Sequence, residues 1–336
     1  MLAIVLYIVV PILCLFGIRG KDCENNVLSK DETLMIRGIG MLFIIFTHMV
    51  KENICTSTYF FYVSGVVGVG VCFLVSGYGL HMSYKTKDKY LENFFGTKIL
   101  RLLLPFMAAY SLYFMLKIFR GENVTAIETL NNLLTVTLPG VTFWYLKIQF
   151  LLYAFFYISY RFVTKINYKI FSVIFLSIGY IMLAKLFGLE LFWYNSCLFF
   201  SLGLILAEYQ SKILPLLRNK NVFLINGLAF TFLYLVLYYF GRLGIDWLFD
   251  MIYMFFFAGL AIWFVQKKGD SWALKLLGYY SIEVYLIHTV IGGYFDSTQP
   301  LSYILLPVVS VIIGIPIHQI STKLTNFILR RDRSVN

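Results

Sequence analysis

The stretch KDETLMIRGIGMLFIIFTHMV, residues 30–50, decides the fold class. Its charged beginning passes into an apolar run at 34–50, close to the ~20 residues with which an α-helix crosses the hydrocarbon core of a bilayer. Apolar runs of similar length recur along the chain, with only short polar gaps between them. The pattern predicts a chain that crosses a membrane many times.

The composition supports this prediction. Of 336 residues, 60% are hydrophobic and 13% are charged, and the mean hydropathy is +0.79. So few charges do not cover the surface of a water-soluble globule. We therefore predict an all-α fold, a polytopic bundle of about eleven transmembrane helices. The predicted spans lie near 2–18, 34–50, 60–80, 99–118, 142–160, 170–187, 192–208, 222–240, 246–265, 276–296 and 302–322.

The net charge of +11 is distributed as a topology signal rather than as a nucleic-acid-binding stripe. Basic residues gather in alternate loops and in the C-terminal tail, which predicts an outside N-terminus and a cytoplasmic C-terminus in the cell membrane. Arg19 and Lys21 follow the first apolar run, the reverse of a signal peptide's charge order, so we expect that run to be retained. The basic loops hold Arg19, Lys21, Lys30; Lys85, Lys87, Lys89, Lys98, Arg101; Arg161, Lys165, Lys169; Lys212, Arg218, Lys220; and Lys267, Lys268, Lys275.

We divide the chain into an N-terminal helix with its cytoplasmic loop (1–30), a membrane domain (31–322) and a basic tail (323–336). The polar gaps are too short to form a soluble domain with its own core. The five cysteines form no C-x-x-C pair and have no histidine at a metal-ligand spacing. We predict neither a metal site nor a disulfide framework.

Two ionisable residues in the 34–50 helix are the first candidates for function, because such groups are costly inside a membrane. Arg37 and His48 are eleven positions apart, which returns to within about 20° of the same helix face and separates them by roughly 16 Å along the axis. Arginine binds phosphate bidentately, and histidine can act as a general base. Alternatively, Arg37 snorkels to the interface, while His48 bonds a neighbouring helix or lies near the outer interface.

The spacing of Arg37 and His48 resembles the signature of the membrane acyltransferase-3 superfamily, an arginine and a histidine separated by ten residues on an early helix. Four further blocks resemble the family in the same order. They are GVVGVGVCFLVSGYGL (65–80, with Ser76, Gly77 and Tyr78), FFGTKILRLLLPF (94–106, with Lys98, Arg101 and Pro105), FWYL (143–146) and LGYYSIEVYLIH (277–288). The resemblance covers roughly 30–322 and leaves the first helix as an addition. Lys98 stands where the family often has a second arginine, and lysine lacks the bidentate fork.

The resemblance implies an O-acyltransferase, commonly an O-acetyltransferase, that acylates cell-surface polysaccharides such as an exopolysaccharide or lipid-linked saccharides. Its implied donor is acyl-CoA, commonly acetyl-CoA, entering from the cytoplasm. Arg37, Lys98 and Arg101 would then bind the nucleotide phosphates. The catalytic pair would be Arg37 and His48, with His48 either deprotonating the acceptor hydroxyl or transiently carrying the acyl group.

Weaker candidates for substrate binding are Trp144, Glu283 and His288. Trp144 stacks on a sugar or anchors a helix at the interface. Glu283 and His288 are about 140° apart on one helix and do not share a face, so Glu283 neutralises a basic residue or lines a cavity, and His288 binds substrate or bonds another helix. We expect Gly65, Gly68 and Gly70 to serve helix packing. His81 and His318 are expected at the membrane interface.

Two other functions fit the same residues. A transporter or flippase of a lipid-linked saccharide or a small anion would line its path with Arg37 and His48, although the repeat symmetry and paired broken helices typical of transporters are not evident. A degenerate family member acting as a sensor or scaffold would not bind acyl-CoA.

Overall fold

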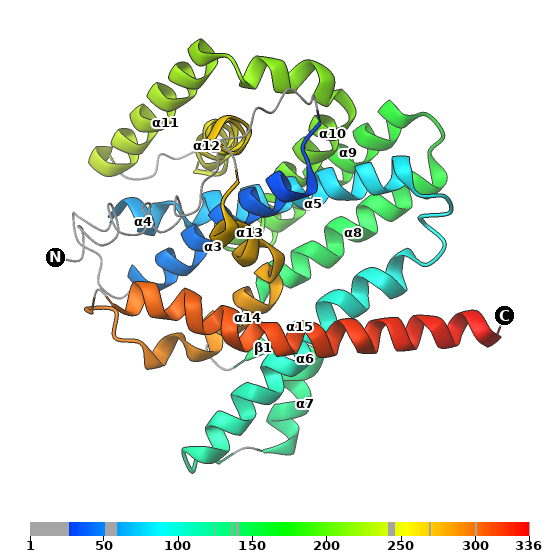
Figure 1. Cartoon of the computed structure of the whole chain (residues 1–336), viewed down its shortest axis with the longest axis vertical. Coiled ribbons are helices and arrows are strands. Elements are labelled where there is room, and N and C mark those ends of the chain that lie inside the picture. The colour runs from blue at the N-terminus through cyan, green and yellow to red at the C-terminus, as the bar shows by residue number, and fades with distance from the viewer. Residues whose placement is uncertain are drawn as a thin grey trace.

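A computed structural model of the chain describes residues 27–50, 59–123, 125–135, 137–138, 141–240, 246–268, 270–299 and 301–335. These residues form a helical bundle with one small hairpin (Figure 1). The helices are α3 (Lys30–Val50), α4 (Tyr59–Val63), α5 (Gly65–Thr86), α6 (Phe94–Phe119), α7 (Ala126–Leu134), α8 (Trp144–Phe162), α9 (Ile166–Leu186), α10 (Cys197–Leu217), α11 (Lys220–Phe240), α12 (Asp246–Lys268), α13 (Trp272–Tyr279), α14 (Ser281–Ile291) and α15 (Ser302–Val335). Strands β1 (Thr137–Leu138) and β2 (Val141–Thr142) pair antiparallel.

The predicted all-α, multi-pass fold is confirmed. Eight helical segments of the described ranges are long and apolar enough to cross a membrane, and each corresponds to a predicted span. The predicted span 142–160 corresponds to α8, which is helical but outside that set. The predicted first span, 2–18, lies outside the described residues.

One predicted span is wrong. The span 276–296 is not one helix, because the chain breaks at Tyr280 between α13 and α14 and α14 ends at Ile291. The break lets α13 pack across α3, with Gly278 against the backbone of Leu34. The last helix, α15, continues to Val335, so most of the proposed basic tail at 323–336 is helical.

Close helix packing rests on glycines, as predicted for the block at 65–80. Gly68 of α5 lies against the carbonyl of Gly40 in α3, and Gly77 of α5 lies against the carbonyl of Phe200 in α10. A Cβ at either position would collide with backbone, which cannot move aside as a flexible side chain can. The glycines therefore hold α3, α5 and α10 together as the centre of the bundle.

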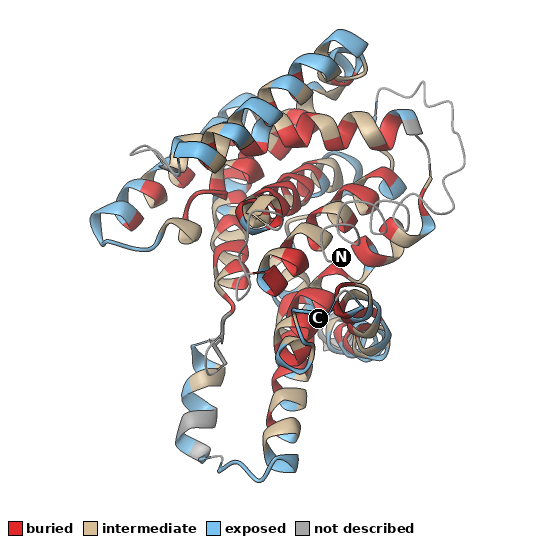
Figure 2. Ribbon diagram, turned by 90° about the vertical axis from the view of Figure 1, so that its left-hand side faces the viewer, coloured by how far each residue is buried: buried red, intermediate tan, exposed pale blue. Residues whose placement is uncertain are grey.

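The bundle has apolar side chains both inside and outside. Figure 2 shows buried residues concentrated in the middle of the molecule, and exposed ones on the outer helices and on the projecting part formed by α6 and α7. On α11, Leu228 and Phe232 are exposed, as are Phe171 and Phe175 on α9. Exposed apolar surface of this extent fits helices in contact with lipid.

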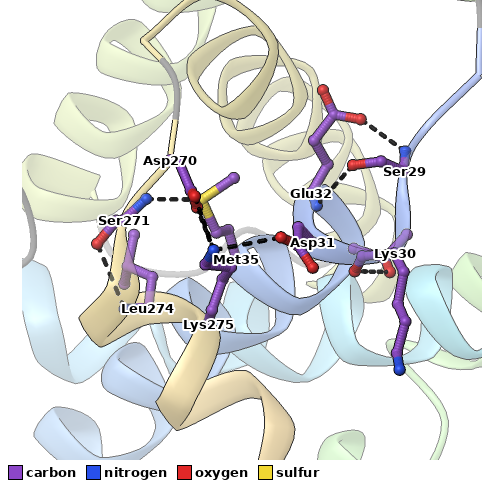
Figure 3. A network of polar contacts seen from close by, with 10 residues as sticks. Ser29, Lys30, Asp31, Glu32, Met35, Asp270, Ser271, Leu274 and Lys275 are labelled. Atoms are coloured by element: carbon purple, nitrogen blue, oxygen red, sulfur yellow. Dashed lines mark hydrogen bonds and ion pairs between the residues drawn. The ribbon is translucent and has the colours of Figure 1, made fainter. Parts of the chain in front are cut away.

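The N-terminus of α3 is held by a capping box. The Ser29 backbone N–H donates to Glu32 Oε2 over 2.6 Å, and the Glu32 N–H donates to Ser29 Oγ over 3.1 Å (Figure 3). Next to it, Lys275 of α13 forms ion pairs with Asp31 and Asp270 at 3.2 and 2.6 Å. These contacts fix the end of the helix that carries Arg37.

Candidate active site

Arg37 and His48 lie on one uninterrupted helix, α3, as the sequence predicts. Arg37 is half-buried near the beginning of the helix, and His48 is exposed near its end. Each lies near side chains of other helices, and a line of contacts connects these two groups of side chains.

Around Arg37, positive charge accumulates. Arg37 is within electrostatic range of Lys98 on α6, which is also within range of Arg101. Phe94 lies four residues before Lys98 on α6, and Leu102 lies four residues after it. Both are buried, so Lys98 lies on the same face of α6, which packs against the bundle. Its ammonium lies over the Tyr90 ring, 5.8 Å from the centroid. The three predicted cofactor-binding residues thus gather at one place.

Among the described residues, this cluster has no acidic partner at ion-pair distance. Across the described part of the chain, no carboxylate forms an ion pair with Arg37, Lys98 or Arg101. Lys85, by contrast, pairs with Glu208 at 3.0 Å. Arg37 and Lys98 are half-buried and Arg101 is exposed. Cations that lack a carboxylate partner among the described residues favour an anionic ligand.

A chain of neutral polar groups lies next to Arg37. Gln149 of α8 donates to Ser76 Oγ of α5 over 3.2 Å and accepts from the Tyr145 hydroxyl over 3.2 Å. The Ser76 hydroxyl lies 3.4 Å from that of Tyr153. Both tyrosines are within electrostatic range of Arg37. The serine of the Ser-Gly-Tyr block therefore joins α5 to α8 beside the cations.

At the other end of α3, two histidines form a pair. His48 Nδ1 lies 2.8 Å from His288 Nε2 of α14, and the rings are nearly parallel with centroids 5.1 Å apart. His288 Nδ1 lies 2.9 Å from the carbonyl of Val284. A carbonyl only accepts, so the neutral His288 ring carries its proton on Nδ1 and its Nε2 accepts. His48 then donates through Nδ1 and carries its own basic lone pair on Nε2.

Aromatic contacts connect the two ends. The Tyr145 ring lies 5.2 Å from that of Tyr285, and the Tyr285 ring lies 5.9 Å from that of His288. Phe73 of α5 also stacks on Tyr145, with the ring centroids 4.9 Å apart. A continuous line of side chains therefore runs from the cation cluster to the histidine pair.

Of the remaining predicted residues, Trp144 lies beside this line, with its ring 6.4 Å from that of Tyr145, whereas Glu283 faces away from it. Glu283 is 4% exposed and its Oε1 is 2.8 Å from His318 Nδ1 on α15, so it faces a different helix from His288, as their angular separation predicts. Trp144 is half-buried and packs against Phe192 at 5.4 Å.

His81 packs inside the protein rather than at its surface. His81 is fully buried, between the Tyr160 hydroxyl at 2.5 Å and Glu208 Oε2 at 2.8 Å. Its place one turn before the basic loop suggested a headgroup position, but α8 and α10 cover it.

Four further residues of the site are not predicted by the sequence patterns: Tyr145, Gln149, Tyr153 and Tyr285. Gln149 carries a signal, because an amide in the apolar run 142–160 needs a partner. The tyrosines carry none, since the chain contains 25 of them. Within the described ranges, no group of three His, Cys, Asp or Glu residues is placed to hold a metal ion.

Comparison with known proteins identifies one family. The profile of the acyltransferase domain, acyltransferase-3 type, matches residues 35–319 and therefore includes both ends of the site. No curated protein and no solved structure matches the chain.

Proposed function

The chain belongs to the acyltransferase-3 family and is a membrane acyltransferase, and on this premise we propose that it moves an acyl group from acyl-CoA, in the first instance acetyl-CoA, to a hydroxyl of a cell-surface or lipid-linked glycan. The observation that supports this most is the arrangement along α3, with a cation cluster at one end and a histidine pair at the other. A long donor with phosphates at one end and a thioester at the other matches this arrangement.

Arg37, Lys98 and Arg101 are the proposed phosphate ligands. They gather without carboxylate partners among the described residues, and CoA carries several phosphate charges. Arginine binds such groups through a bidentate fork, and lysine acts as a point charge. The donor's nucleotide end is therefore proposed to lie at the N-terminal end of α3.

His48 is the proposed general base. Its Nε2 takes the proton of the acceptor hydroxyl while the hydroxyl oxygen attacks the thioester carbonyl carbon. The new C–O bond forms, the C–S bond breaks, and the CoA thiolate leaves and receives the proton from His48. During the step His48 is an imidazolium whose Nδ1–H bond to His288 becomes charge-assisted and stronger.

The alternation of basic loops supports an orientation in which the cation cluster faces the cytoplasm, where CoA thioesters are made. His48 would then lie toward the outer side, where a surface glycan is modified. Trp144, at the beginning of α8, is proposed to contact the sugar, since an indole offers a flat face to a pyranose ring.

The test is mass spectrometry of the surface glycans of cells that express the wild type, His48→Ala, Arg37→Ala or Arg161→Ala. Arg161 is an exposed arginine at the end of α8 and serves as the charge-matched control. We expect one acyl mass increment with the wild type and the control, and its loss in the other two at equal protein level. Full acylation by both His48→Ala and Arg37→Ala would disprove the assignment.

A further inference from the structure

A groove opens between α6 and α8, close to the cation cluster. It is half-open, has a volume of ≈330 Å³, and is lined by Phe95, Ile99 and Leu103 of α6 and by Phe150 and Tyr153 of α8. The three α6 residues recur every four positions and form one stripe along the helix. This volume is at the lower end of the ~300–1,000 Å³ of ligand pockets, which suits a slender ligand.

The groove stripe lies beside the stripe that carries Lys98. Lys98 and Ile99 are consecutive, so their side chains leave α6 about 100° apart. Helix α6 thus has apolar groove residues on one face and the Lys98 cation on the adjacent face. Whatever enters the groove has positive charge beside it.

Tyr153 makes the groove polar at one point. It is both a lining residue and the neighbour of Ser76 in the polar chain. It is also within electrostatic range of Arg37 and Arg101. The Tyr153 hydroxyl already has the Ser76 hydroxyl as a partner, so a simple hydrocarbon tail would leave only these charges without a counterpart. A ligand with phosphate at its end provides that counterpart, and amides along its length can hydrogen-bond to the two hydroxyls.

We propose that the groove between α6 and α8 is the lateral entrance for the donor, and that it holds the pantetheine arm of acyl-CoA while the phosphates remain at Lys98 and Arg101. The proposal rests on the proposed function and adds to it the route and the residues that select the arm. The apolar wall of Phe95, Ile99 and Leu103 accommodates the methylene segments of the arm. Tyr153 and Ser76 accompany its amides toward the line of side chains that leads to His288.

Filling the groove is the direct test. Ile99→Trp and Leu103→Trp place an indole in it, whereas Met115→Trp adds the same ring at an exposed position elsewhere on α6. For purified protein we expect a rise of about tenfold in the KM for acetyl-CoA with either groove variant, with kcat little changed. The Met115→Trp protein should match the wild type. The binding of acetyl-pantetheine, which lacks the nucleotide, should be weakened by Leu103→Trp but not by Arg101→Ala.

Crosslinking provides a readout that does not depend on turnover. Ile99 is replaced by photoreactive p-benzoylphenylalanine, and the protein is irradiated with radiolabelled acetyl-CoA, with Met115 replaced in the same way as the control. Labelling at position 99 alone, abolished by excess CoA, supports the proposal. Capture of phospholipid instead of acetyl-CoA at position 99 overturns it.

The results separate the entrance from the proposed function. If Arg37→Ala raises the KM for acetyl-CoA while both groove variants leave it unchanged, the donor binds elsewhere, and the function stands without this entrance. If the wild type neither binds nor uses acetyl-CoA, the proposed entrance and the proposed function are both wrong.

Discussion

Replacing His288 tests how the histidine pair sets the reactivity of His48. The perturbation removes an acceptor that lies 2.8 Å from His48 Nδ1. A neutral hydrogen bond contributes about 1 kcal/mol, and one to an ionised group about twice as much. The difference, about 1 kcal/mol, stabilises His48 only after it has taken the proton of the acceptor hydroxyl and become an imidazolium. His288→Leu should therefore lower kcat roughly five- to tenfold and leave the KM for acetyl-CoA unchanged.

The assay is the steady-state release of CoA thiol by purified protein with an acceptor glycan. His288→Gln serves as the conservative variant, because its amide oxygen can accept the hydrogen bond from His48 Nδ1–H. This variant should recover most of the kcat that His288→Leu loses. His48→Ala removes the base itself and should cost about 10²–10⁴-fold in kcat. Wild-type kcat in His288→Leu would refute the reasoning. So would equal defects in the Leu and Gln variants accompanied by equal losses of melting temperature.

Three further predictions concern the scaffold. Gly77→Leu should lower the melting temperature in detergent by an amount corresponding to about 1–3 kcal/mol or more, because α10 backbone lies against this position, while Gly179→Leu, which has open space, should not. His318→Leu should destabilise the protein by about 1–3 kcal/mol more than Glu283→Leu, since it leaves a buried carboxylate without its partner, whereas Glu283→Leu leaves a histidine that is partly exposed to other partners; equal melting temperatures would contradict this. Asp270 and Asp31 raise the pKa of Lys275 above its ordinary 10.5, so its contribution to stability is complete below that pH and is lost as the pH rises through the raised pKa. The melting-temperature advantage of wild type over Lys275→Met should therefore shrink above about pH 10.5, and an advantage independent of pH would show that the ion pairs contribute nothing.

Much of the fold follows from the sequence because lipid imposes a length rule on every span. Runs such as 34–50 and 222–240 correspond to helices in the structure. The break at Tyr280 was not predicted, because it follows from the contact of Gly278 with α3 rather than from a local breaker such as proline. Hydropathy predicts the spans but contains no information about which helices pack against each other.

The site divides in the same way. The common helix of Arg37 and His48 could be read from a spacing of eleven residues, since helix geometry is local. The pairing of His48 with His288 spans 240 positions and depends on how α3 and α14 pack. The role of Gln149 depends equally on the approach of α5 to α8. Contacts between distant segments are set by packing, which one sequence does not specify.

The most direct measurement is a comparison of kcat and KM for acetyl-CoA in purified Arg37→Ala and His48→Ala proteins. We expect Arg37→Ala mainly to raise KM and His48→Ala mainly to lower kcat, because the two residues act on opposite ends of one donor. Unchanged kinetics in both variants, or an effect of His48→Ala on KM alone, would contradict it.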